Sequence, residues 1–485
     1  MGEEAEALGP PSHVTLALVS HTNVGKTTLA RTLLRRDVGE VLDQAHVTDE
    51  AELFDLLEIE AGTLRLADTP GFGDSARLLK RLRVSDKPVY WFLQQNWDRL
   101  VDRPFWCSQQ AALAVREYAD VVLYLVNATE HPEDAGYADL ELELMEWLQV
   151  PTLILLNQTG DTSYRKEVAE HMAEAWRRHT ERFSVVKEVV ELDAFTRCWV
   201  EEGALLARAA VELPAGKKDL MAELCLAWQE RNLETFRRAV GLLARYLAVT
   251  ATDRESLPQK RPTREQKTQA MEALGHRLIR RTEELMASLL TLHELEGDVA
   301  SQIDRQLDAF AVRGEEALGT ERSALLGSVV SGAVGGLAAD LLAGGLTFGG
   351  GMLAGAILGA VGGAGLARGY ELVQGDRLPE VGWAPLFLIQ LVEQALLRYL
   401  AVAHFGRGRG EFRHEEASRR WQEAVSEALR QDREDWRGAL QEAAAEKNLD
   451  DALGRLQPRL GGALRAVLIR GYPGAAELLS ASRER

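Results

Sequence analysis

The chain has 485 residues, of which 46% are hydrophobic, so it is long enough to form more than one domain, each with its own core. The formal net charge of -18 argues against a nucleic-acid-binding protein, because binding to phosphates requires a basic surface. The three cysteines are far apart and lack metal-ligand spacing, which favours a reducing, cytoplasmic compartment. Residues 1–11 are acidic and have no apolar core, so we interpret them as a disordered leader.

Residues 12–200 alternate short apolar runs with helix-forming segments, as expected for βαβ units around a mostly parallel sheet. The runs are rich in Val, Leu and Ile, which is typical of strands that helices cover on both faces. The predicted strands are residues 14–19, 53–59, 63–67, 121–127, 152–157 and 184–192. We therefore expect a three-layer α/β domain at the amino terminus.

The first predicted strand is followed by the sequence SHTNVGKTT, residues 20–28, and then by a helix-forming run. A strand, a tight loop and a helix in this order direct backbone N–H groups toward one point, which suits phosphate oxygens. In the pattern G-x-x-x-x-G-K-[ST], the lysine contacts the β- and γ-phosphates and the hydroxyl ligates Mg²⁺. Ser20 replaces the first glycine, and an ordinary strand-to-helix turn is the alternative. The predicted phosphate-binding residues are Asn23, Val24, Gly25, Lys26, Thr27 and Thr28, with Thr27 also a metal ligand.

The sequence DTPG, residues 68–71, directly follows the third predicted strand. We expect Asp68 to complete the Mg²⁺ shell and Gly71 to let a backbone N–H approach the γ-phosphate. Thr48 lies between the two motifs. Its hydroxyl either closes over Mg²⁺ when the third phosphate is present or makes a local turn.

The NVGKT and DTPG sequences resemble the translation-factor-like class of small GTPases, in the branch of the Era-like ribosome-assembly and tRNA-modification GTPases. The resemblance implies GTP and Mg²⁺ as ligands and hydrolysis of GTP to GDP and phosphate. In that branch an apolar residue follows D-x-x-G, as Phe72 does here, so no glutamine positions the water. Several members use the asparagine that corresponds to Asn23 to bind K⁺; otherwise Asn23 is a turn residue. Lys26 and Asn23 are therefore the predicted catalytic residues.

The base-binding motif of this class, N-K-x-D, appears here as NQTGD, residues 157–161. Asn157 matches the motif, but Gly160 stands at the aspartate position and Asp161 comes one residue late. Without a carboxylate that accepts hydrogen bonds from the N–H groups of guanine, discrimination between guanine and other bases should fall. Asp161 or Asp193 could supply this carboxylate instead. NQTG followed by LDAFTRCW, residues 192–199, resembles a bacterial family of GTPases with a C-terminal domain of unknown function.

Residues 74–106 are predicted to be an insertion that contains Trp91, Trp97 and Trp106. We expect this aromatic cluster to pack the first domain against the helical part; a partner-binding patch is the alternative. From Thr196 onward no strand is detectable, which predicts an all-α remainder with a helical domain at 201–323 and a helical region at 368–485. Leucines at heptad spacing within 271–299 favour an intramolecular bundle, with a coiled-coil homodimer as the alternative.

Residues 324–367 form a glycine-rich apolar segment with Asp340 as its single charge. Glycines spaced by four, such as Gly351 and Gly355, permit close packing of membrane helices. A break near the middle gives a hairpin whose arms are close to the lower length limit for crossing about 30 Å of hydrocarbon. The segment is either associated with a membrane, buried as a helical hairpin in a soluble protein, or a disordered linker.

Two functional hypotheses follow from these patterns. In the first, the chain is a GTP-hydrolysing switch that is cytoplasmic or attached to the inner membrane through its hairpin, with lipid or a membrane protein as partner. In the second, it is a soluble nucleotide-binding scaffold or Era-like assembly factor with little hydrolysis, since no catalytic glutamine or arginine finger can be named. Neither hypothesis includes a nucleic-acid partner.

Overall fold

The computed structural model describes residues 12–21, 24–35, 51–84, 102–157, 166–191, 199–295, 370–374, 378–405, 415–446, 448–472 and 475–480. The chain divides into two compact units, the first made of Met1–Asn232 with His404–His414 and the second of Leu233–Ala403 with Glu415–Arg485. The division falls inside one long helix, α9 (Ala215–Thr252), beyond the residue 200 at which the sequence predicts the end of the first domain.

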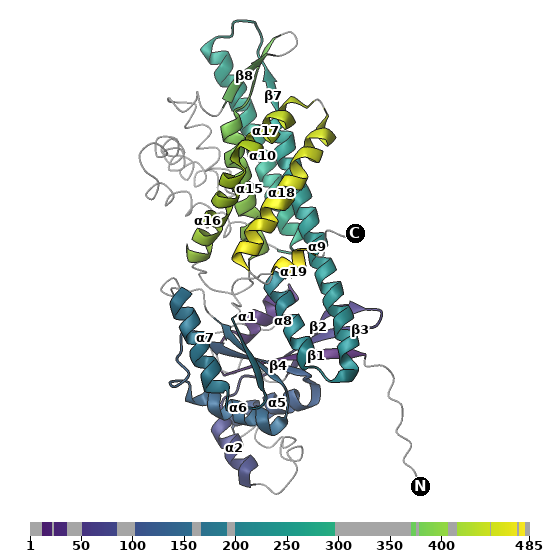
Figure 1. Cartoon of the computed structure of the whole chain (residues 1–485), viewed down its shortest axis with the longest axis vertical. Helices are drawn as coiled ribbons and strands as arrows, with labels where there is room; N and C mark the ends of the chain where they lie inside the picture. The colour runs from purple at the N-terminus through teal and green to yellow at the C-terminus, as the bar shows by residue number, and fades with distance from the viewer. Residues whose placement is uncertain are drawn as a thin grey trace. The chain divides into compact units, whose positions relative to one another are not determined.

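The first unit is built on a six-stranded sheet with the strand order β2-β3-β1-β4-β5-β6 (Figure 1). Neighbouring strands are parallel, except that β2 is antiparallel to β3. The strands are β1 (His13–Ser20), β2 (Glu52–Ile59), β3 (Gly62–Asp68), β4 (Val121–Asn127), β5 (Thr152–Asn157) and β6 (Val186–Glu191). All six predicted strands are present, and the predicted α/β fold class is confirmed.

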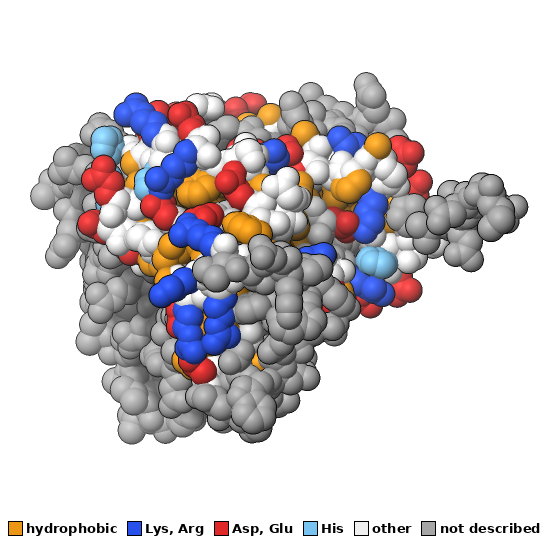
Figure 2. Space-filling model, turned by 90° about the horizontal axis from the view of Figure 1, so that it is seen from below, with side chains coloured by type: hydrophobic (Ala, Val, Ile, Leu, Met, Phe, Trp, Pro, Cys, Tyr) orange, Lys and Arg blue, Asp and Glu red, His pale blue; other side chains and the backbone are white. Residues whose placement is uncertain are grey.

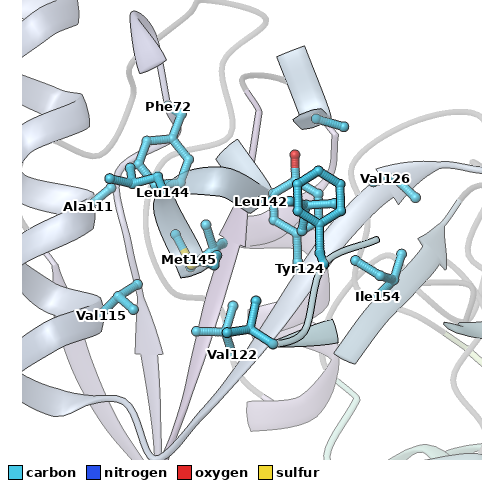
Figure 3. Close-up of a cluster of buried hydrophobic side chains, with 14 of the residues drawn as sticks. Phe72, Ala111, Val115, Val122, Tyr124, Val126, Leu142, Leu144, Met145 and Ile154 are labelled. Atoms are coloured by element: carbon cyan, nitrogen blue, oxygen red, sulfur yellow. The ribbon is translucent and has the colours of Figure 1, made fainter. Parts of the chain in front are cut away.

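Helices cover both faces of this sheet. On one face lie α1 (Lys26–Leu34), α8 (Trp199–Glu212) and the first part of α9. On the other lie α2 (Ser75–Val84), α5 (Arg103–Tyr118), α6 (Gly136–Leu148) and α7 (Lys166–Thr180). Alternate residues of the central strand β4 face the two layers, because successive side chains of a strand point to opposite sides. Val122, Tyr124 and Val126 join the second of these cores, which is drawn in Figure 3.

The second unit is mainly helical. Its helices among the described residues are the remainder of α9, α10 (Arg264–Leu292), α15 (Pro385–Ala403), α16 (Glu415–Gln431), α17 (Arg433–Ala445), α18 (Leu449–Gly471) and α19 (Ala475–Ser480). Helix α10 begins with a capping box, in which the Thr263 side chain accepts from the backbone N–H of Gln266 and the Gln266 side chain accepts from that of Thr263. Its heptad residues Leu278 and Leu285 are buried within the unit, as expected for intramolecular packing.

The second unit also contains a small antiparallel sheet that the sequence did not predict. Its three strands, in the order β7-β9-β8, are β7 (Arg254–Ser256), β9 (Pro379–Trp383) and β8 (Tyr370–Gln374). The expectation that no strand follows Thr196 is therefore wrong. Strands of three to five residues are too short to show alternation, and β9 contains proline and glycine, which normally indicate turns. Ion pairs from Arg277 of α10 to Asp253 at 3.0 Å and Glu255 at 2.7 Å hold β7 in place.

Helix α15 has the length and apolar character of a membrane-crossing helix, and it is the one such helix among the described residues. Most of it is nevertheless buried inside the second unit, where Glu393 accepts a hydrogen bond from Ser426 at 2.9 Å. This is the burial of a core helix. The leader, the glycine-rich segment 324–367, Trp91 and Trp97 lie outside the described residues, whereas Trp106 is buried in α5.

Candidate functional site

The loop between β1 and α1 lies at the edge where the parallel strands β1, β3, β4 and β5 end. Gly25 precedes the first helical residue with φ 98° and ψ 22°, a left-handed conformation that costs glycine little. A Cβ atom added at Gly25 would lie 2.7 Å from Nδ2 of Asn157. The loop therefore requires glycine at this position for both its backbone conformation and its close packing.

Asn157, the last residue of β5, connects that strand to the loop. Its side chain is buried, and Nδ2 donates to the backbone oxygen of Val24 at 2.7 Å. The amide predicted to lie near the base thus contacts the loop itself; a further contact with the base stays a prediction. Val24 and Thr28 are buried on either side of Gly25 and Lys26, so the loop is well packed.

Asp68 and Thr27 form the part of the site that suits a metal ion. The Thr27 hydroxyl donates to Oδ2 of Asp68 at 3.2 Å, while Oδ1 of Asp68 is buried and accepts no hydrogen bond from the described part of the chain. Burial raises the pKa of Asp68, and the charge of Lys26 and the Thr27 hydrogen bond oppose this. A buried carboxylate oxygen without a donor, next to a threonine hydroxyl, fits the oxygen ligands that Mg²⁺ prefers.

Lys26 is the cationic group of the site. Burial lowers its pKa below the ordinary value of 10.5, while the carboxylates of Asp68 and Glu141 oppose this change. An ammonium group that has lost part of its hydration gains from a bound anion. Lys26 is therefore well suited to contact phosphate oxygens.

The DTPG segment is paired with the loop through its backbone. The Phe72 N–H donates to the Ser20 carbonyl at 3.1 Å, and His21 and Phe72 form a parallel bridge. The Phe72 ring is fully buried in the core near Ala111 and Leu144 (Figure 3). Gly71 is also buried. In this arrangement Phe72 cannot position a water molecule, as its apolar side chain already predicts.

One group beside the loop was missed by the sequence interpretation. Glu141 of α6 is fully buried and pairs with His21, the second residue of the loop. A signal for it exists, because Glu141 falls on the apolar stripe that Ala138, Leu142 and Met145 define at helical spacing. A glutamate on a buried face normally requires a specific partner.

Four predicted site residues lie outside the described residues: Asn23, Thr48, Asp161 and Asp193. Their roles in binding K⁺, in closing over Mg²⁺ and in contacting the base stay predictions. The described predicted residues, by contrast, are brought together at one edge of the sheet. They are Val24, Gly25, Lys26, Thr27, Thr28, Asp68, Gly71 and Asn157.

Two family models match the chain. The first, described as "50S ribosome-binding GTPase", matches residues 15–158, and the second, described as "Domain of unknown function (DUF3482)", matches residues 181–458. The second match alone spans more than half of the chain. The chain belongs to the DUF3482 family. This DUF3482 protein carries a P-loop GTPase domain at its amino terminus, and the predicted resemblance is confirmed.

Several solved structures are similar to this DUF3482 protein. A variant of Era from Aquifex aeolicus, bound to GDP.AlF4-, is 20% identical over 42% of this chain and 58% of that chain, with a TM-score of 0.31. SelB from Methanococcus maripaludis, with a GTP analogue, is 14% identical over 43% of this chain and 36% of that chain, with a TM-score of 0.28. Likenesses at this level carry no argument about activity. No curated protein matches the chain.

Proposed function

We propose that the chain is a molecular switch that binds GTP with Mg²⁺ and hydrolyses it to GDP and phosphate. The observation that carries the proposal is the contact of Thr27 with Asp68 beside Lys26, where the second carboxylate oxygen of Asp68 is buried and has no donor among the described residues. The match of residues 15–158 to a GTPase family favours GTP over ATP.

In this proposal each described residue has a defined role. Lys26 contacts the phosphates, and the backbone of the loop around Gly25 surrounds them. Thr27 and Asp68 hold Mg²⁺, which when bound neutralises part of the phosphate charge. Asn23 either binds K⁺ at the phosphates or shapes the loop. Because Phe72 is buried, a nucleotide-binding scaffold with little hydrolysis is the second candidate function.

Calorimetric titration with GTP, GDP, ATP and xanthosine triphosphate in Mg²⁺ tests the proposal. We expect GTP and GDP to bind more tightly than ATP, and phosphate to be released from GTP in a single-turnover assay. The preference for GTP over xanthosine triphosphate should be weaker than in a protein with a complete N-K-x-D motif, because an acceptor for the guanine N–H groups is out of place. Equal affinities for ATP and GTP would contradict the assignment of a guanine nucleotide.

The same titration with Asp161→Asn and Asp193→Asn identifies the base contact. Replacing the aspartate that accepts hydrogen bonds from guanine should reduce the preference for GTP over xanthosine triphosphate. The variant of the other aspartate serves as the control. If both variants keep the wild-type preference, neither aspartate contacts the base.

We further propose that residues 324–367 attach the protein to the cytoplasmic face of the inner membrane, through lipid or a membrane protein. The support is the apolar, glycine-spaced sequence of the segment. Bound GTP can bias attachment only if it binds the attached and the detached states of the protein with different affinity, a coupling that is typically about 1 to 3 kcal/mol. Attachment by apolar burial should survive high salt, because salt screens charge contacts rather than apolar ones.

Flotation with liposomes at low and high salt, with GDP or a non-hydrolysable GTP analogue, checks this expectation. Full-length protein should float at both salt concentrations, and more of it should float with one nucleotide than with the other. A protein that never floats and that unfolds when 324–367 is deleted would instead have a buried hairpin.

An Era-like assembly factor is the rival of the membrane proposal. A solved structure of Era contains part of 16S ribosomal RNA. On the face shown in Figure 2, several Lys and Arg side chains gather in one group, and acidic and basic side chains are interspersed elsewhere. The net charge of -18 nevertheless favours a partner other than RNA.

A further inference from the structure

Glu141 is a buried carboxylate beside the phosphate loop. Its Oε1 atom lies 2.7 Å from Nδ1 of His21, and its Oε2 atom accepts from the Tyr124 hydroxyl at 2.7 Å. Burial raises the pKa of Glu141, while the hydrogen bonds and charges of its neighbours oppose this. A buried carboxylate that loses its donors is strongly unfavourable, so these contacts decide whether its charge is tolerated.

His21 is held in place by its surroundings. Its ring stacks on that of Tyr137, with centroids 4.3 Å apart and planes 23° apart, and its backbone forms a bridge with Phe72. The Tyr137 hydroxyl in turn donates to Glu130 at 2.6 Å. His21 thus joins the first half of the loop to α6 on one side and to the DTPG segment on the other.

The charge of Glu141 also acts on the phosphate-binding lysine. Its carboxylate is one of two that raise the pKa of Lys26 against the effect of burial. A negative charge that acts on Lys26 also repels the phosphates that Lys26 contacts. In the tautomer that carries hydrogen on Nδ1, His21 offsets part of this repulsion, because the N–H dipole opposes the field of the carboxylate.

We propose that His21 is a positioning residue: its contact with Glu141 fixes the start of the phosphate loop and gives the buried carboxylate beside that loop a hydrogen-bond donor. The proposal rests on the proposed function and deepens it, since the pattern G-x-x-x-x-G-K-[ST] leaves this position open. The pair makes the site sensitive to how many phosphates the nucleotide carries.

The test is the ratio of GTP to GDP affinity, measured by calorimetry. His21→Phe keeps a ring for Tyr137 but removes the donor. It should weaken GTP binding about tenfold and GDP binding less, because GTP carries the additional charge. His21→Asn places an amide donor near the position of the histidine Nδ1 atom and should keep most of the wild-type ratio. His21→Phe combined with Glu141→Gln should restore the ratio to within about twofold of the wild-type value.

The matched control is His179→Phe, which removes a second histidine–carboxylate contact, from Nε2 of His179 to Asp139 at 2.6 Å, in the same unit. It should leave the ratio unchanged. If His21→Phe does not fold, His21→Leu and His21→Asn form the comparison, since they have similar shapes and differ in the donor. If His21→Phe loses the same affinity for GTP as for GDP, or if the double variant does not regain the wild-type ratio, the role of His21 is wrong but the proposed function stands. If the wild-type protein binds no guanine nucleotide, the proposed function is wrong as well.

Discussion

Changing Gly25 to alanine is expected to abolish nucleotide binding. The backbone at Gly25 has φ 98°, a conformation that costs a residue with a side chain about 1 to 2 kcal/mol. The new Cβ atom would lie 2.7 Å from Nδ2 of Asn157, so one of the two residues must move. Asn157 is the donor that holds Val24, and its movement would open the loop. We expect the affinity for GTP and GDP to fall by more than about a hundredfold.

Gly216→Ala is the matched control. Gly216 lies in the first turn of α9, and nothing lies within 4 Å of a Cβ atom added there. Alanine is the better helix former by up to about 1 kcal/mol, so thermal stability should stay the same or rise. Nucleotide affinity should not change. Wild-type affinity in Gly25→Ala, measured by calorimetry, would show that the loop does not bind phosphate in the conformation described.

Lys26→Ala should lose both nucleotide binding and turnover. The side chain supplies the positive charge of the site, and a charge-assisted contact to phosphate is strong in a partly desolvated position. Its pKa is lowered by burial in the free protein, and a bound phosphate should raise it again. Binding at high pH is therefore linked to proton uptake, and wild-type affinity should fall as pH rises through the lowered pKa. Calorimetric titration of the wild-type protein with GTP at several pH values checks this dependence.

The control for Lys26→Ala is Lys218→Ala. Lys218 of α9 is exposed, and its ammonium group donates to the carbonyl of Val211, in the last turn of α8, at 2.8 Å. Its removal should leave GTP affinity and phosphate release at wild-type values. If instead Lys26→Ala retains full hydrolysis, residues 20–28 are not the catalytic phosphate loop.

The phosphate half of the site could be predicted because its parts are local in sequence. A strand, a glycine, a lysine and a hydroxyl at fixed spacing bind phosphate mainly through the backbone, and Asp68 follows a recognisable strand. The pair of His21 and Glu141 could not be predicted in the same way. Its members are 120 positions apart, and their meeting depends on how α6 packs on β4. Strand β7 was missed because it is stabilised by pairing with β9, which is far away in the sequence. Strands β8 and β9 pair locally, but they are too short to show an alternating pattern.

The boundary between the two family models has a structural consequence. The GTPase model ends at residue 158, after β5, whereas the DUF3482 model begins at residue 181, before β6. The last strand of the GTPase sheet, helix α8 and the first part of α9 therefore belong to the second match. Leu205 and Trp228 from these helices complete the core on one face of the sheet. A protein in which one matched segment was exchanged would leave that face without its cover, so the two matched segments together supply the first folding unit.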